Sequence, residues 1–161
     1  MYLSVRKDGK PVDPFAPEFD GASCAFAAVD TLWNQDFTSS FTYQPTKVAQ
    51  IGLADTGPSL VDVMDGKWIE FAVKPDAPLV VYGMAVNGKA GDQMILRLNG
   101  PSGSIVNSKR PSLEKRKAQW FAFAGKRAPD GGWPRGSYTL SVEVLRAGEI
   151  LHKQSETIVL E

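Results

Sequence analysis

The chain has 161 residues, 43% of them hydrophobic and 22% charged, and its 18 lysine and arginine residues balance 18 aspartate and glutamate residues. This length and composition are ordinary for one globular domain with a core, or for one domain with an appendage. Zero net charge excludes a general attraction to nucleic acid or to an anionic membrane, and no run approaches the ~18 apolar residues of a membrane span. A single cysteine, Cys24, excludes an internal disulfide.

The charge is distributed unevenly along the chain. Residues 11–66 carry eight acids against one base, Lys47, whereas residues 107–127 carry seven bases against one acid, Glu114. Two solvated surfaces are the commonest explanation of such runs, and a basic surface for an anionic polymer is the alternative. The seven bases are Lys109, Arg110, Lys115, Arg116, Lys117, Lys126 and Arg127.

The first 66 residues predict an irregular segment with little helix. Residues 2–6 are typical of a short strand, and Asp8-Gly9 predicts a tight turn into an extended stretch at 11–15. The alanine-rich residues 22–41 favour a short helix capped by Asp30 or Thr31, with a loop as the alternative. Residues 46–54 alternate as a strand does, and residues 58–66 predict one helical turn that Gly66 ends.

From residue 67 to residue 161 the chain is uniformly β-like. Tyr138, Leu140, Val142 and Val144 alternate with polar residues, and a turn around Ala147-Gly148 makes residues 136–160 a hairpin. Further strands are predicted at 68–73, 79–86, 93–98, 104–108 and 117–124. The 79–86 run is apolar throughout, as in a strand buried on both faces, and the polar 104–108 segment suits a sheet edge.

Seven short strands separated by turn signals predict an antiparallel, immunoglobulin-like β-sandwich. The Cys…Trp…Cys signature of true immunoglobulin domains is missing, so the prediction concerns architecture alone. We expect residues 1–66 to pack on a sandwich formed by residues 67–161.

Catalytic and metal-binding patterns are weak. His152 is the only histidine, and nothing in the sequence around Cys24 supports a Cys24–His152 dyad. One histidine and one cysteine cannot form a zinc site of the usual kind, and no calcium-loop motif is present. Asp62 and Asp65 would share a helix face, where exposed acids are commoner than catalytic ones. No cofactor is predicted.

The glycine-rich segments 99–103 and 131–136 predict hairpin turns, because they lack the spacing of phosphate-binding loops. Most of the aromatic residues should be core. Trp133 is the one we expect to be exposed, because Gly131, Gly132 and Pro134 place it in a loop. Trp133, Arg135 and the bases of 109–117 are therefore the candidate contacts for a ligand or partner.

Residues 3–14, Leu-Ser-Val-Arg-Lys-Asp-Gly-Lys-Pro-Val-Asp-Pro, resemble the last hairpin of the LytM/lysostaphin-type zinc metallopeptidases, the M23 family, which cut peptidoglycan cross-bridges. Residues 79–160 also resemble a β-rich C-terminal extension of some bacterial members. The matching phrases lie at 91–98, 100–103, 117–125 and 132–138. The first resemblance covers about a tenth of the chain.

The resemblance departs from the family at its zinc site. The alignment of Val5-Arg6 puts Tyr2 where the second histidine of the family's His-x-His belongs, and the remaining ligands find no counterpart. Tyrosine does not replace a neutral imidazole at neutral pH without a large pKa change. The resemblance therefore transfers no catalytic or metal residue to this chain.

These patterns predict a non-catalytic accessory domain of a bacterial cell-wall peptidase, in contact with peptidoglycan or an envelope protein. One alternative is part of an active hydrolase whose zinc ligands lie outside this chain, and another is a sandwich that binds a partner by strand pairing. The resemblance implies the periplasm or cell envelope, although residues 1–15 are no signal peptide. We expect either a piece of a metallopeptidase or a free-standing derivative of one, with no nucleic-acid partner and no membrane insertion.

Overall fold

The computed structural model of the chain describes residues 5–12, 32–34, 45–68 and 72–160. The chain divides into two compact units, Met1–Tyr43 and Gln44–Glu161. The predicted boundary at 66/67 thus lies inside the second unit. Most of the predicted helical zone at 22–41 falls outside the described residues, and Leu32 and Trp33 form a bend.

The first unit contains a hairpin of two short strands, β1 (Val5–Lys7) and β2 (Lys10–Val12). Asp8 and Gly9 join them with φ angles of 52° and 77°. Two consecutive left-handed residues are what a type I′ hairpin turn requires, and Asp-Gly is a preferred pair for it. The predicted turn is confirmed.

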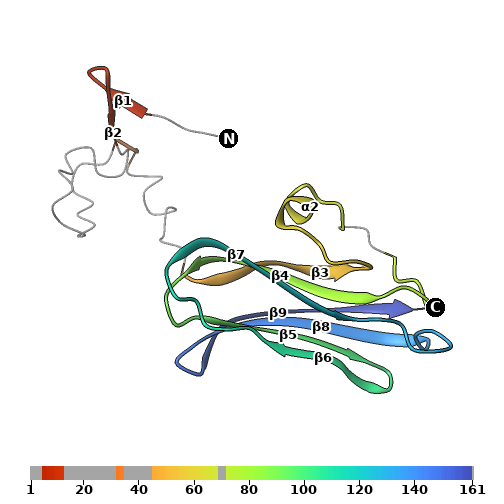
Figure 1. Ribbon diagram of the computed structural model, residues 1–161. Helices are drawn as coiled ribbons and strands as arrows, with labels where there is room; N and C mark the ends of the chain where they lie inside the picture. The colour runs from red at the N-terminus through yellow and green to blue at the C-terminus, as the bar shows by residue number, and fades with distance from the viewer. Residues whose placement is uncertain (1–4, 13–31, 35–44, 69–71, 161) are drawn as a thin grey trace. The chain divides into compact units, whose positions relative to one another are not determined.

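The second unit is an antiparallel β-sandwich of two sheets, with strand orders β3-β4-β7 and β6-β5-β8-β9 (Figure 1). The mainly β class is confirmed. The strands are β3 (Lys47–Ala54), β4 (Leu79–Gly88), β5 (Gln93–Gly100), β6 (Gly103–Lys109), β7 (Lys117–Lys126), β8 (Gly136–Arg146) and β9 (Glu149–Leu160). Because β6 ends its sheet, the predicted edge strand at 104–108 is confirmed.

The core lies between the two sheets and follows the alternation seen in the sequence. The four apolar residues of β8, from Tyr138 to Val144, are at most 1% exposed, and so are three alternating residues of β5. The β5 residues are Met94, Leu96 and Leu98. The predicted inward faces of both strands are confirmed.

The strand β4 is buried on both faces, as its continuous apolar run predicts. Leu79 and Val81 belong to the core between the sheets, whereas Val80 and Tyr82 form a second cluster on the outer face of the three-stranded sheet. Val63 and Trp68, from the connection between β3 and β4, pack on this outer face and keep it from solvent.

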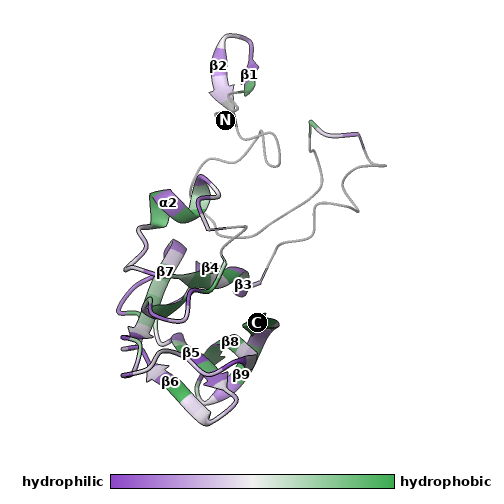
Figure 2. Ribbon diagram, turned by 90° about the vertical axis from the view of Figure 1, so that its right-hand side faces the viewer, coloured by the Kyte–Doolittle hydropathy of each residue, from purple (hydrophilic) through white to green (hydrophobic). Residues whose placement is uncertain are grey.

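A short helix, α2 (Leu60–Met64), lies beside the outer face of the three-stranded sheet (Figures 1 and 2). Ser59 and Asp62 form a reciprocal capping box, and the hydrogen bonds from Ser59 hold the pKa of Asp62 below its ordinary value. Gly66 follows with φ 78°, so the predicted helical turn and its stop are confirmed. Asp62 therefore serves as a cap.

The connection between α2 and β4 departs from the prediction. A strand was expected at 68–73, but Trp68 lies in a turn and residues 72–78 include no strand, while 69–71 fall outside the described residues. The seventh strand of the sandwich is instead β3, which pairs with β4. The sequence predicts this strand at 46–54 but places it in the irregular segment 1–66, outside the sandwich.

One hydrogen bond ties the start of β8 to the loop before it. The Tyr138 hydroxyl donates to the Pro134 carbonyl oxygen at 2.6 Å, as in the tyrosine corner of immunoglobulin-like sandwiches. However, β6 pairs with β5, whereas the corresponding strand of a constant-type immunoglobulin domain belongs to the other sheet. The immunoglobulin-like class stays a prediction.

Candidate functional site

The predicted basic segment forms a loop at one end of the sandwich, between β6 and β7. We call residues 109–117 the basic loop. Its start is held because the Arg110 amide donates to Met94 O at 2.8 Å, which continues the pairing of β6 with β5. The Leu113 amide donates to Asp92 O at 2.9 Å, and the Gly91 amide donates back to Leu113 O at 2.8 Å. The loop is thus fastened to the β4–β5 turn.

The side chain of Leu113 anchors the middle of the basic loop. It is buried, with 7% of its surface exposed, and belongs to the main core cluster. A Cβ on Gly88 would lie 2.7 Å from Leu113 Cδ1, so the missing side chain at Gly88 makes room for this anchor. With its centre fixed, the loop displays its charged residues on a rigid base.

Asp92 organises the strands around this end of the sandwich. Its carboxylate accepts two hydrogen bonds from Arg146, at 2.7 and 2.9 Å, and one from the Lys89 amide at 2.8 Å. Arg146 also donates to Thr46 Oγ1 at 2.8 Å. Burial raises the pKa of Asp92, but the hydrogen bonds from Arg146 and Lys89 outweigh it and hold the pKa below its ordinary value.

All five bases of the basic loop are exposed. Arg97, Arg146 and Lys153 form ion pairs with carboxylates, but no ion pair joins a base of the loop to any carboxylate of the described residues. The loop and β7 border a hollow of about 340 Å³ whose lining includes three bases, Arg110, Lys115 and Lys117, and one acid, Glu114. Uncompensated cations beside a concave surface suit an anionic ligand.

The predicted exposure of Trp133 is wrong. Only 8% of its surface is exposed, and its indole Nε1 donates to Ala77 O at 2.7 Å. Gly131 and Gly132 take left-handed φ angles, and this turn brings the Trp133 amide to Pro75 O at 2.8 Å. The ring enters the core because its one polar atom finds a backbone carbonyl there. It is therefore no free stacking surface, whereas the neighbouring Arg135 is exposed.

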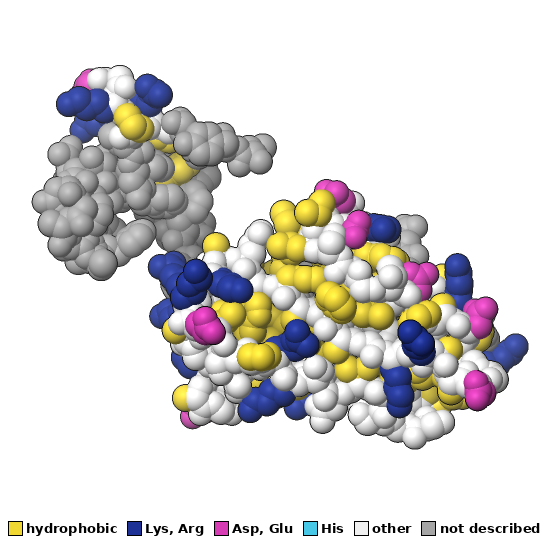
Figure 3. Space-filling model, viewed as in Figure 1, with side chains coloured by type: hydrophobic (Ala, Val, Ile, Leu, Met, Phe, Trp, Pro, Cys, Tyr) yellow, Lys and Arg dark blue, Asp and Glu magenta, His cyan; other side chains and the backbone are white. Residues whose placement is uncertain are grey.

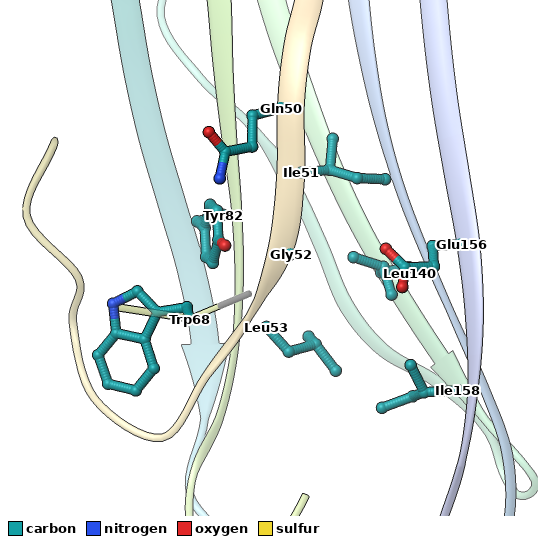
Figure 4. Close-up of a pocket in the computed structure, with 9 residues that line it drawn as sticks. All are labelled: Gln50, Ile51, Gly52, Leu53, Trp68, Tyr82, Leu140, Glu156 and Ile158. Atoms are coloured by element: carbon teal, nitrogen blue, oxygen red, sulfur yellow. The ribbon is translucent and has the colours of Figure 1, made fainter. Parts of the chain in front are cut away.

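A smaller hollow, of about 190 Å³, lies along β3 (Figure 4). Three polar side chains, Gln50, Tyr82 and Glu156, share it with apolar residues of β3, β8 and β9 and with Trp68. Burial and the Glu156 charge raise the pKa of Tyr82 against the opposing hydrogen bond from Gln50, so its phenol stays neutral at physiological pH. The hollow is smaller than the 300–1,000 Å³ typical of small-molecule sites.

Among the described residues, the remaining chemical candidates do not gather into a site. His152 lies in β9 opposite Val144, half-buried, and its Nδ1 has no hydrogen-bond partner among the described residues. Cys24 lies outside those residues, so the predicted absence of a dyad stays a prediction. In the described ranges no three His, Cys, Asp or Glu side chains gather in a way that could hold a metal ion.

No helix in those ranges is long and apolar enough to cross a membrane.

Sequence reasoning missed the Asp92–Arg146 pair and the hollow along β3. The two partners are 54 residues apart, because Asp92 lies in the turn between β4 and β5 and Arg146 ends β8, so no local pattern links them. The predicted strand at 117–124 is confirmed as β7, where Trp120 faces the core and Phe121 packs against the outer-face cluster.

Comparisons with known proteins leave the family open. No protein-family model matches the chain, and no curated protein matches it. Among solved structures, a β-glucosidase from Kluyveromyces marxianus is similar over 73% of this chain, with 12% sequence identity and a TM-score of 0.34. The chain spans 14% of the length of that protein. A similarity this low carries no argument about activity.

Proposed function

We propose that the chain is a non-catalytic accessory domain of a bacterial cell-wall metallopeptidase, and that its basic loop holds anionic polymer of the cell envelope. The observation that carries this proposal is the set of five exposed bases without an ion-pair partner among the described carboxylates. Arg97, Arg146 and Lys153 are instead neutralised by carboxylates of the sandwich itself. The basic loop must take its counter-charges from outside.

The way the loop is held supports a binding role. Backbone hydrogen bonds to Asp92 and Gly91, together with the buried Leu113 side chain, fix its course. A fixed loop loses little conformational entropy when a ligand binds, so more of the electrostatic attraction appears as affinity. Peptidoglycan, whose peptides carry carboxylates, is an anionic polymer of the compartment that the resemblance of residues 3–14 implies.

The non-catalytic part of the proposal rests on the sequence. Tyr2 stands where the resembled peptidases have a histidine ligand, and no catalytic residue transfers from them to this chain. The role we assign is to bring an attached or partner peptidase to the polymer. Placement in the periplasm or cell envelope belongs to the same proposal.

Cosedimentation with purified peptidoglycan tests the role of the basic loop. The triple variant Lys115→Gln, Arg116→Gln, Lys117→Gln removes three exposed charges, each contributing about 0.5 kcal/mol, so we expect binding to weaken about tenfold. A matched control removes three other exposed bases that form no ion pair with a described carboxylate: Lys10→Gln, Lys74→Gln and Lys126→Gln. Equal loss in both triple variants would contradict a specific role of the basic loop.

A further inference from the structure

The strand β7 has an open edge. It spans ten residues and ends the three-stranded sheet, and within the described part of the chain β4 is its only strand partner. Strands at sheet edges are usually shortened, bulged or covered, because their unpaired backbone groups recruit other strands. The pairing of β7 with β4 is regular: each residue from Leu79 to Val86 pairs with one residue from Lys126 to Gln119, without a register shift. A long and regular edge of this kind is a template for a further strand.

Three neighbouring aromatic rings lie on the outer face of the three-stranded sheet, Tyr82 on β4 and Phe121 and Phe123 on β7. The ring centroids of Tyr82 and Phe121 lie 6.2 Å apart, and those of Phe121 and Phe123 lie 6.1 Å apart. Tyr82 is buried, but Phe123 is 42% exposed. Exposure therefore increases from the central strand β4 toward the open edge, as it would if a neighbouring strand were missing there.

A hollow of about 460 Å³ continues this face at the far end of β7. Its lining includes Val80, Phe123 and Gly125 together with two bases and one acid, Lys126, Arg127 and Asp55, so the bases outnumber the acid there. A Cβ on Gly125 would lie 2.6 Å from Val80 Cγ2, so the glycine lets the β7 backbone pack closely on the buried valine side chain. The hollow offers an apolar contact for a side chain of an added strand.

The charges beside β7 indicate what kind of strand fits. Lys117 begins the strand next to the basic loop, and Lys126 ends it next to Arg127. The two lysines are nine residue steps apart, which is about 30 Å along an extended strand. Figure 3 shows hydrophobic side chains across this view of the sandwich, with lysine and arginine side chains among them and toward both ends, where some aspartate and glutamate side chains also lie.

These charges disfavour a second copy of the chain as the added strand. In antiparallel pairing of two β7 strands, Lys117 of one copy would meet Lys126 and Arg127 of the other, and in parallel pairing identical bases would meet. Like charges directly opposite one another destabilise a strand pair. An extended segment with acidic residues at both ends meets the opposite charge in either direction.

We propose that β7 binds an extended protein segment by strand addition, and that the segment has an apolar alternating centre and acidic residues at both ends. Main-chain hydrogen bonds to β7 supply affinity, as in other complexes that extend a sheet edge. Alternate side chains of the segment cover Phe123 and the hollow beside Gly125. The bases at the two ends of β7 select the acidic ends, which adds a partner class to the polymer-binding role.

A synthetic peptide of about ten residues tests this directly. Its centre alternates valine and threonine, and aspartates flank it on both sides. We expect amide hydrogen exchange to slow along β7 when the peptide is added, and to stay unchanged along the other long edge strand, β9. Phe123→Ala should weaken peptide binding about tenfold, whereas the matched substitution Val159→Ala, on β9 and 65% exposed, should leave it unchanged.

Two modified peptides separate strand addition from simple charge attraction. Methylation of alternate amides blocks the hydrogen bonds of one edge of the peptide, so one methylated set should abolish binding and the other should preserve it. Equal binding of both sets, or equal protection of β7 by polyglutamate, would overturn the proposal. So would undiminished binding of a peptide with lysines in place of the aspartates, or a dimer of the free chain that buries β7.

Discussion

Arg146 holds Asp92 by two hydrogen bonds, at 2.7 and 2.9 Å, and through it joins the end of β8 to the turn between β4 and β5. Asp92 is fully buried, and its backbone carbonyl accepts the amide of Leu113 in the basic loop. The pair therefore stabilises the surface on which the proposed function depends.

The Asp92–Arg146 pair should contribute strongly to stability. Asp92→Ala leaves Arg146 and the Lys89 amide without their acceptor, and loss of one partner of a buried pair costs roughly 3–5 kcal/mol. We expect about 3 kcal/mol, because the Arg146 side chain is 36% exposed and water can replace part of the interaction. Urea unfolding measures the difference, with the exposed Asp76→Ala as control. A loss of less than about 1 kcal/mol would show that the pair is dispensable.

Acid should destabilise the sandwich through Asp92 and Glu143. Burial raises the pKa of each carboxyl group, but hydrogen bonds outweigh it. Asp92 accepts from Arg146, and Glu143 accepts from Arg97 and Lys153. Both pKa values therefore lie below their ordinary range. The unfolded chain then binds protons more readily than the folded one. The stabilisation is fully present above the ordinary carboxyl pKa of about 4 and is lost as the pH falls through the folded-state values.

The corresponding measurement is the free energy of unfolding at about pH 6, 4 and 3. We expect a decrease across this range, and a smaller decrease in the variant Glu143→Gln. A free energy that stays constant from about pH 6 to pH 3 would contradict the assigned pKa directions.

Gly52 is needed for the packing of Tyr82. A Cβ at Gly52 would lie 2.6 Å from Tyr82 Cζ, and the ring is only 1% exposed, so it cannot move into solvent. Gly52→Ala should destabilise the chain by about 1–3 kcal/mol, the usual cost of overpacking. Gly57→Ala is the matched control, because its Cβ would lie 3.2 Å from Phe123, whose ring is partly exposed and has room to shift. Equal melting temperatures for the two variants would count against tight packing at Gly52.

The sequence predicts those parts of the fold whose causes are local. The alternation from Tyr138 to Val144, the Asp8-Gly9 turn and the stop at Gly66 all follow from backbone preferences and from the period of burial. The exposure of the basic loop follows in the same way, because lysine and arginine are seldom buried without partners.

Features that depend on distant contacts were missed or wrong. The glycine and proline residues beside Trp133 predict a loop. They do not show that the carbonyl of Ala77, 56 residues away in sequence, accepts a hydrogen bond from the indole and lets the ring be buried. The strand at 68–73 was predicted from alternation alone, and β3 was separated from the sandwich because its pairing with β4 is not visible in the sequence. The partner of Asp92 is hidden for the same reason.

The most direct test of the proposed function is to incubate the chain with purified peptidoglycan and zinc, and to measure bound protein and released fragments together. We predict that the chain sediments with the polymer at low salt, returns to solution at about 0.5 M salt as the charges are screened, and releases no soluble fragments. Chelator-sensitive release of fragments, or a chain that stays in the supernatant at low salt, would contradict a non-catalytic, polymer-binding domain.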